Sequence, residues 1–71
     1  MNIDKYRKLK YAMMNNNSKV SLKKGTICYI IGEDNLDRLI LSPINKELII
    51  MHIYENDLEK ITLDELMVEL L

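Results

Sequence analysis

The sequence has neither tryptophan nor phenylalanine, one cysteine, one histidine, one proline and only two glycines among its 71 residues. A single cysteine excludes a disulfide within the chain and a metal site built on several cysteines. The glycines form no phosphate-binding loop, and no serine, histidine and acid are grouped as in a nucleophilic catalytic site. We therefore expect no enzymatic activity, no cofactor and no metal.

Long hydrophobic runs are also missing. The longest ones, residues 27–31 and 48–54, fall far short of the roughly 20 apolar residues that span a bilayer. The polar run at residues 15–18 stands where a signal peptide would need its apolar stretch. These features predict a cytoplasmic protein with no membrane association. With 48% hydrophobic and 30% charged residues, the composition is typical of one small globular domain covering residues 1–71.

Residues 1–14 have the spacing of an amphipathic helix. Asn2 is a candidate N-cap, and Asp4 would lie in the first turn, where the helix dipole favours an acid. At roughly 100° per residue, five apolar side chains fall on one stripe: Ile3, Tyr6, Leu9, Met13 and Met14. The polar residues 15–18 would end this helix and form a short linker.

Residues 20–61 predict a β-rich core. The segments expected to form strands are residues 20–22, 26–31, 38–41 and 47–54. Polar turns are expected at residues 23–25, 33–35, 45–46 and 55–57. Ser42 and Pro43 should close the third strand, because proline cannot donate to a β-ladder. Both faces of the last strand are largely apolar, so we expect the sheet to be covered on both sides.

Residues 62–71 carry the clearest periodic signal in the chain. Thr62 and Glu65 have the spacing of a capping box, in which each side chain binds the other residue's free backbone N–H. The apolar residues that follow repeat with the period of a helix: Leu63, Leu66, Met67, Leu70 and Leu71. Leu70 extends this stripe toward a point where so small a domain has little left to cover it.

Between residues 23 and 61, Lys24-Gly25 precedes a strand, two polar turns suit hairpins, and residues 57–61 form a closing run. This layout resembles a small SH3-like barrel, although the aromatic ligand-binding residues of peptide-binding SH3 domains are missing. The resemblance implies a fold and not a function. Overall we expect an α+β domain, with a small bent antiparallel sheet or SH3-like barrel between an N-terminal and a C-terminal amphipathic helix. The Ile-, Lys- and Asn-rich composition also resembles small phage and mobile-element proteins of low-G+C bacteria.

The charge is divided along the chain. Residues 1–24 hold seven bases and one acid, a net charge of +6, whereas residues 25–71 hold three bases and ten acids, a net charge of −7. The basic end could lie on nucleic-acid phosphate, with an aromatic ring stacking on a base. Alternatively, its bases are a solvated face that compensates the acidic half. The candidate nucleic-acid-binding residues are Lys5, Arg7, Lys8, Lys10 and Tyr11.

Acidic residues gather around two turns, where they could imitate nucleic-acid phosphate toward a basic groove on a partner, or simply keep the domain soluble. The candidate protein-binding residues are Glu33, Asp34, Asp37, Glu55, Asp57 and Leu70. Cys28 and His52 lie in predicted strands, where we expect packing roles.

We therefore favour a non-enzymatic protein-interaction module with an acidic surface, which binds and modulates a larger host protein. An inhibitor encoded by a phage or mobile element, such as an anti-CRISPR protein, is one form of this hypothesis. One alternative is a nucleic-acid-binding accessory protein that uses the basic N-terminal segment. Another is a homodimer that completes its core through the sheet or the C-terminal helix.

Overall fold

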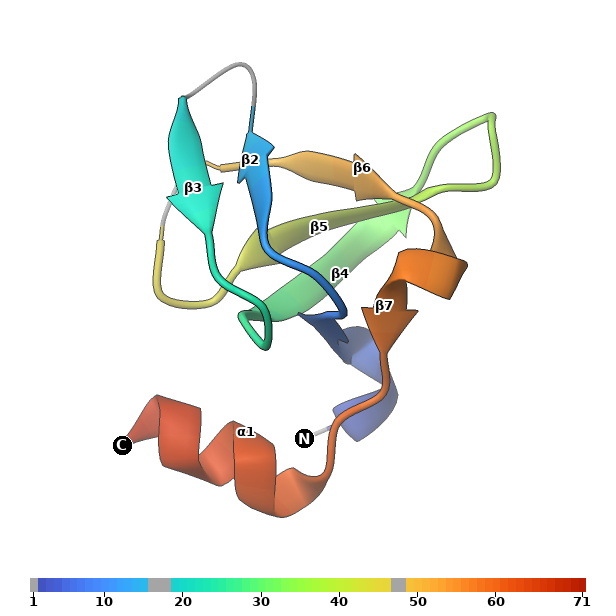
Figure 1. The fold of residues 1–71 in the computed structure, drawn as a ribbon. Coiled ribbons are helices and arrows are strands. Elements are labelled where there is room, and N and C mark those ends of the chain that lie inside the picture. Colours follow the sequence, from blue (N-terminus) through green and yellow to red (C-terminus); the bar gives the residue numbers. More distant parts are fainter. Residues whose placement is uncertain (1, 16–18, 47–48) are drawn as a thin grey trace.

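The computed structural model describes residues 2–15, 19–46 and 49–71, and this part of the chain is mostly β (Figure 1). Its elements, in order, are η1 (Ile3–Lys5), β1 (Tyr6–Leu9), β2 (Met13–Asn15), β3 (Val20–Leu22), β4 (Ile27–Glu33), β5 (Leu39–Pro43), β6 (Met51–Ile53), η2 (Glu55–Asp57), β7 (Leu58–Glu59) and α1 (Leu63–Leu70). The elements η1 and η2 are single 3₁₀ turns.

Five strands form one antiparallel sheet in the order β6-β5-β4-β1-β7, and β2 and β3 form a separate hairpin. The large sheet curls like half of a barrel, and the hairpin lies across its open side (Figure 1). A bulge between Ile30 and Gly32 in β4 shifts the register against β5, which is a common way to bend a strand. The curl therefore encloses an inner core.

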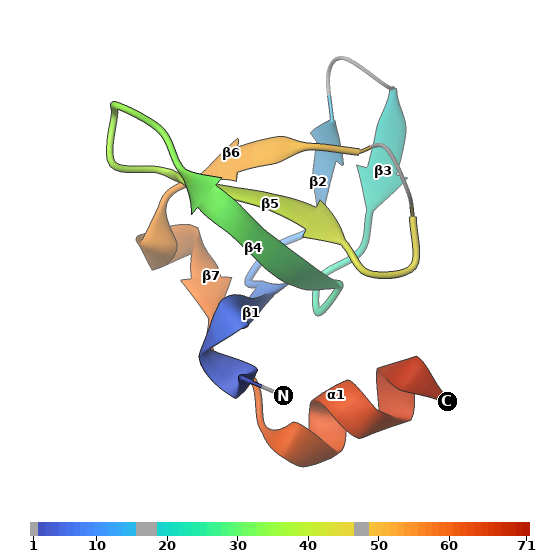
Figure 2. The ribbon, with the colours of Figure 1, turned by 180° about the vertical axis from the view of Figure 1, so that it is seen from behind.

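The inner core contains eight buried residues: Leu9, Leu22, Cys28, Leu41, Ile49, Met51, Ile53 and Leu58. Met13 and Val20 of the hairpin are partly buried and pack against this core. A second cluster lies on the outer side of the sheet, where α1 lies below β1 and β4 (Figure 2). It contains Ile27, Ile61 and Leu66. Strand β4 contributes to both the inner core and the outer cluster, because Cys28 faces inward and Ile27 faces α1.

The predicted N-terminal helix, and with it the α+β class, is wrong. Asn2 does cap a turn, since its side chain accepts from Asp4 N at 3.1 Å, but the turn is the three-residue η1. The chain then continues as β1, which pairs with β4 on one side and β7 on the other. Two neighbouring strands satisfy the backbone of β1, so tertiary pairing overrides the helical spacing of its side chains. Within the described residues, α1 is the only α-helix.

Several other sequence predictions are confirmed. Strand β3 has the predicted bounds, and the capping box of Thr62 and Glu65 is confirmed at the start of α1. The predicted turn at residues 23–25 is also confirmed: Thr26 N donates to Lys23 O at 3.1 Å, and Gly25 has φ of +87°. That positive φ is where a glycine is needed.

Two strand predictions need correction. Strand β5 continues through Pro43, which pairs with Cys28 at the strand's last position, where its missing N–H does no harm. Of the long strand predicted over residues 47–54, β6 contains only Met51–Ile53. Parts of three predicted segments lie outside the described residues: residues 47–48 of this strand, residues 16–18 of the linker and residue 1 of the N-terminal helix. Both faces of the sheet are covered only in part: the curl encloses the inner face and α1 packs over Ile27 on the outer face, whereas Tyr29 of β4 is exposed.

Candidate functional site

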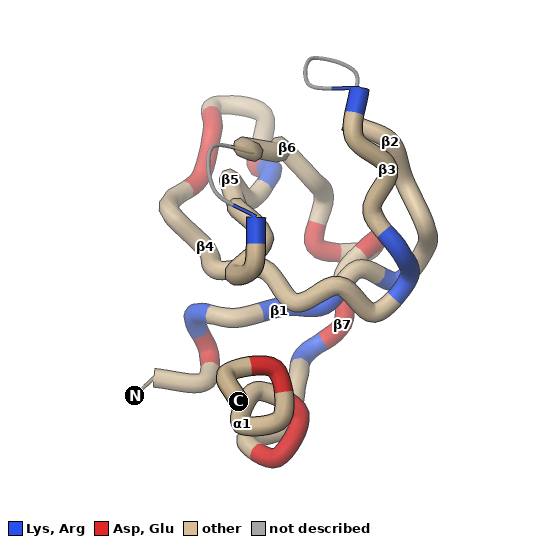
Figure 3. Tube along the Cα trace, turned by 90° about the vertical axis from the view of Figure 1, so that its left-hand side faces the viewer, with Lys and Arg blue, Asp and Glu red and all other residues tan. Residues whose placement is uncertain are grey.

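The helix α1 is held against the sheet by one edge. Leu66 is fully buried in the outer cluster. On the neighbouring edge, Lys8 Nζ of β1 donates to Glu65 Oε2 at 2.6 Å, and Asn45 Nδ2 donates to Glu69 Oε2 at 2.7 Å. Glu65 thus both binds Lys8 and caps the helix, because its other oxygen, Oε1, accepts from Thr62 N in the capping box. Figure 3 looks along α1 and shows the basic positions of β1 above it.

These contacts leave an apolar face of α1 in solvent. Leu63, Met67 and Leu70 are 56%, 48% and 52% exposed. Their spacing of four and three residues places them on one stripe of the helix, next to Leu66. We call these three side chains the helix stripe. A large apolar stripe exposed on so small a domain is typical of an interaction surface.

The helix that carries this stripe is acidic. Asp64, Glu65 and Glu69 lie in α1, and residues 61–71 contain no lysine or arginine. Glu65 and Glu69 are used in holding α1, whereas Asp64 lies in the first turn and is exposed. The surroundings of the helix stripe therefore favour a positively charged counterpart.

The predicted acidic residue Asp34 is an internal anchor of the β4–β5 turn. Its Oδ1 accepts from Leu36 N and Arg38 N, at 2.8 and 3.0 Å, and Oδ2 accepts from Arg38 Nε at 2.8 Å. His52 Nδ1 lies 2.8 Å from the same Oδ2. Removal from water by itself raises the pKa of Asp34, but the hydrogen bonds from His52, Arg38 and Leu36 outweigh it and hold the pKa far below its usual range. This carboxylate is occupied within the turn.

The other predicted protein-binding residues do not form one surface. Glu33 and Asp37 are exposed on the β4–β5 hairpin, at the opposite end of the molecule from α1 (Figure 1). Glu55 is paired with Arg7 Nε at 2.9 Å, and Asp57 is half-buried at the end of η2. Of the predicted set, Leu70 is the member that lies on the helix stripe.

The predicted nucleic-acid-binding residues lie on η1, on β1 and in the loop after β1, and several of them form contacts within the domain. Arg7 is paired with Glu55, and its side chain is only 12% exposed. Lys8 is paired with Glu65, whose hydrogen bond raises the pKa of the lysine against the opposing effect of desolvation. Lys10 Nζ donates to Asn56 O at 3.1 Å, while Lys5 and Tyr11 are exposed. Two of the bases thus compensate acids of the second half.

The remaining polar candidates have packing or turn roles. Cys28 is fully buried in the inner core, and burial raises the pKa of its thiol to about 12. His52 lies on the outer face of β6 beside Asp34. In the part of the chain that the structure describes, no three histidine, cysteine or acidic side chains gather so that they could hold a metal ion. None of its helices is long and apolar enough to cross a membrane.

Comparisons with the models of known protein families, with curated proteins and with solved structures find no match for this chain. The resemblance to SH3-like barrels and to phage or mobile-element proteins therefore stays a prediction. The sequence pointed to Leu70 within its periodic apolar run. It did not separate the buried Leu66 from the exposed members of the run, because all of them share one side of the helix.

Proposed function

We propose that this chain is a non-enzymatic protein-interaction module that uses the helix stripe to bind an apolar groove on a larger protein. The observation that carries the proposal is that α1 is fixed by Leu66 and by its acidic edge, while Leu63, Met67 and Leu70 remain about half exposed. An amphipathic helix that lays its apolar face into a groove is a common mode of recognition.

The charge around the stripe defines the partner's chemistry. Because α1 carries three carboxylates and no base, a groove with a basic rim complements it. Burying the exposed half of the three stripe side chains would contribute about 1 kcal/mol each, or about a hundredfold in affinity together. A module of this kind acts by occupying its partner's groove, and we place it in the cytoplasm.

A second copy of the chain is a poorer occupant of this surface. A two-fold dimer places the same patch against itself. Two copies of α1 would then bring together the Asp64 and Glu69 carboxylates of both helices, which no base of either helix neutralises, while Glu65 is already paired with Lys8. Repulsion of like charges opposes that arrangement.

The test compares three forms of the full chain. The stripe variant is Leu63→Gln/Met67→Gln/Leu70→Gln. The matched control, Tyr11→Gln/Ile50→Gln/Tyr54→Gln, changes three apolar side chains that are equally exposed but lie outside α1. Each tagged protein captures partners from lysate with and without nuclease treatment, and the protein that the unaltered chain retains after nuclease is purified and titrated with all three forms.

We expect the purified partner to bind the unaltered chain and the control equally, and the stripe variant about a hundredfold more weakly. Equal binding by all three forms would contradict the proposal. Loss of the captured material on nuclease treatment would favour the nucleic-acid alternative instead. Self-association that the stripe variant abolishes would favour the homodimer. An inhibitor encoded by a phage or mobile element remains one form of the proposed function.

A further inference from the structure

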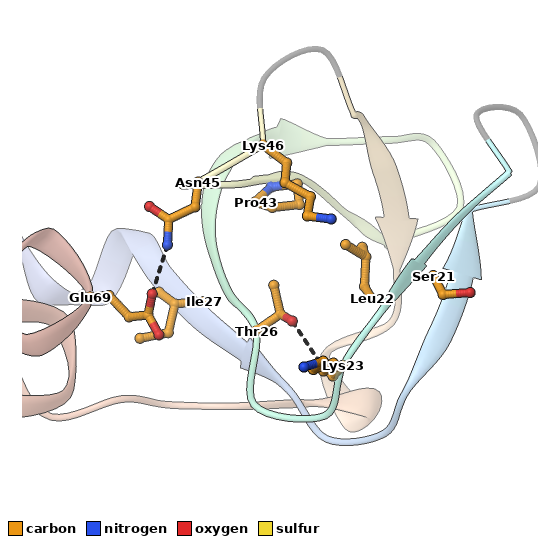
Figure 4. Close-up of a pocket in the computed structure, with 9 residues that line it drawn as sticks. All are labelled: Ser21, Leu22, Lys23, Thr26, Ile27, Pro43, Asn45, Lys46 and Glu69. Carbon is orange, nitrogen blue, oxygen red and sulfur yellow. Dashed lines mark hydrogen bonds between the residues drawn. The ribbon is translucent and has the colours of Figure 1, made fainter.

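A pocket of about 330 Å³ opens between the hairpin side of the domain and the end of α1. Its walls come from β3 and the turn after it, the start of β4, the end of β5 with its following turn, and Glu69 of α1 (Figure 4). The pocket lies apart from the helix stripe, whose residues do not line it. It is at the small end of the range for pockets that hold organic ligands.

The inner part of the pocket is apolar. Leu22, Ile27 and Pro43 line it, and all three are buried in the domain. Leu22 belongs to the inner core and Ile27 to the outer cluster, so the pocket reaches both packed regions of the domain. An apolar group placed here would replace water over side chains that are already fixed by packing.

Two lysines line the same pocket. Lys23 and Lys46 come from different turns; Lys46 reaches into the opening from one side, and Lys23 lies at the opposite side (Figure 4). The turn that carries Lys23 is well fixed, because Thr26 N and Thr26 Oγ1 both donate to Lys23 O, at 3.1 and 2.6 Å. An anion in the opening can therefore be approached by a lysine from each side.

Glu69 sets the charge that the pocket can accept. Its carboxylate accepts from Asn45 Nδ2 at 2.7 Å, which fixes it in the wall. The lining therefore has two positive groups and one negative group, a net charge of +1. A single negative charge balances it, whereas a doubly charged phosphate would meet the repulsion of Glu69.

From this combination we propose that the pocket binds a small monocarboxylate with an apolar body, such as a medium-chain fatty acid. The carboxylate lies between Lys23 and Lys46, and the apolar chain lies on Leu22, Ile27 and Pro43. This site is separate from the proposed protein-binding stripe.

The experiment titrates the full chain, labelled with ¹⁵N, with octanoate, acetate and 1-octanol, and follows the backbone amide signals. Acetate supplies the charge without the chain, and 1-octanol supplies the chain without the charge. The test variant is Lys23→Gln/Lys46→Gln. The matched control is Lys24→Gln/Lys60→Gln, which removes two exposed lysines that do not line the pocket.

We expect octanoate to shift the signals of Leu22, Ile27 and Lys46, and to bind at least about tenfold more tightly than acetate or 1-octanol. The test variant should weaken octanoate binding by about tenfold or more, and the control should leave it unchanged. Equal affinity for octanoate and 1-octanol, or equal loss in both variants, would overturn the proposal. So would octanoate shifts centred on Leu63 and Met67, which would assign the binding to the helix stripe.

Discussion

Lys8 and Glu65 lie 57 positions apart in the chain, and a salt bridge of 2.6 Å joins Lys8 Nζ of β1 to Glu65 Oε2 of α1. The hydrogen bond lowers the pKa of Glu65 and raises that of Lys8. The basic first third of the chain and the acidic remainder thus meet at this contact and at the Arg7–Glu55 pair. At these two contacts, bases of the N-terminal segment and acids of the C-terminal half join β1 to the rest of the domain.

The first prediction separates the buried side of α1 from its exposed side. Leu66→Ala should lower the free energy of unfolding by about 3 kcal/mol, because Leu66 is fully buried and its truncation leaves a cavity. Each of the three substitutions in the stripe variant should change this free energy by about 0.5 kcal/mol or less, and the three together by about 1.5 kcal/mol at most, as exposed substitutions usually do. Urea unfolding followed by circular dichroism measures both. A stripe variant as unstable as Leu66→Ala would show that the stripe belongs to the core.

The second prediction concerns pH. The pKa of Asp34 is lower in the folded chain than the value of about 3.9 for an unfolded aspartate. Its contribution to stability is therefore fully present above about pH 4 and is lost as the pH falls toward the folded pKa. Asp34→Asn should lower stability at pH 7 and reduce the further loss between pH 7 and pH 3. Thermal unfolding at several pH values measures this effect.

Asp37→Asn is the control for that experiment, because Asp37 is exposed in the same turn. Asp37 has φ of +61°, a conformation that asparagine also adopts readily. We expect this variant to keep the pH profile of the unaltered chain. If Asp34→Asn and Asp37→Asn gave the same profile, the hydrogen bonds to Asp34 would not be the cause.

The third prediction concerns Cys28. Its thiol is buried in the inner core, and its pKa of about 12 leaves almost no thiolate at neutral pH. A chromogenic disulfide reagent should therefore react slowly with the folded chain and rapidly in denaturant. Rapid reaction of the folded chain, at the rate seen in denaturant, would contradict the packing described for β4.

The fourth prediction compares the two glycines. Gly25→Ala should cost about 1 kcal/mol, because φ of +87° disfavours any residue with a Cβ. Gly32→Ala should be neutral or slightly stabilising, because its Cβ would meet open space and its φ does not lie in the left-handed region. Urea unfolding of both variants measures the difference. Equal effects would mean that the Lys23–Thr26 turn does not depend on the conformation of Gly25.

Local signals in the sequence predicted the local parts of this fold. The capping box at Thr62 and the glycine turn at Gly25 each depend on neighbouring residues, and both are present as expected. The N-terminal segment depends on distant partners. Its helix-like spacing was outweighed by pairing of β1 with residues 27–29 and 58–59, and no local pattern encodes that pairing.

For the candidate sites too, the sequence indicated features that depend on neighbouring residues and missed those that depend on distant ones. The surplus of apolar residues near Leu70 was visible in the sequence, but the choice of Leu66 as the docked residue depends on where α1 meets Ile27 and Ile61. The pocket was not predicted, because Lys23 and Lys46 are brought together only by the curl of the sheet. Asp34 looked like a surface acid, and its hydrogen bonds in the β4–β5 turn became visible only in three dimensions.

The most direct test of the proposed function asks which surface touches the partner. Three chains are made, each with a photo-reactive residue at one exposed apolar position. The positions are Met67 on the helix stripe, Leu36 in the acidic β4–β5 turn and Tyr11 beside the basic strand β1. Each chain is then irradiated with the purified partner. If the helix stripe is the binding surface, a covalent product forms with the position-67 chain and little product forms with the other two. A product formed chiefly at position 36 or at position 11 would contradict the proposed function.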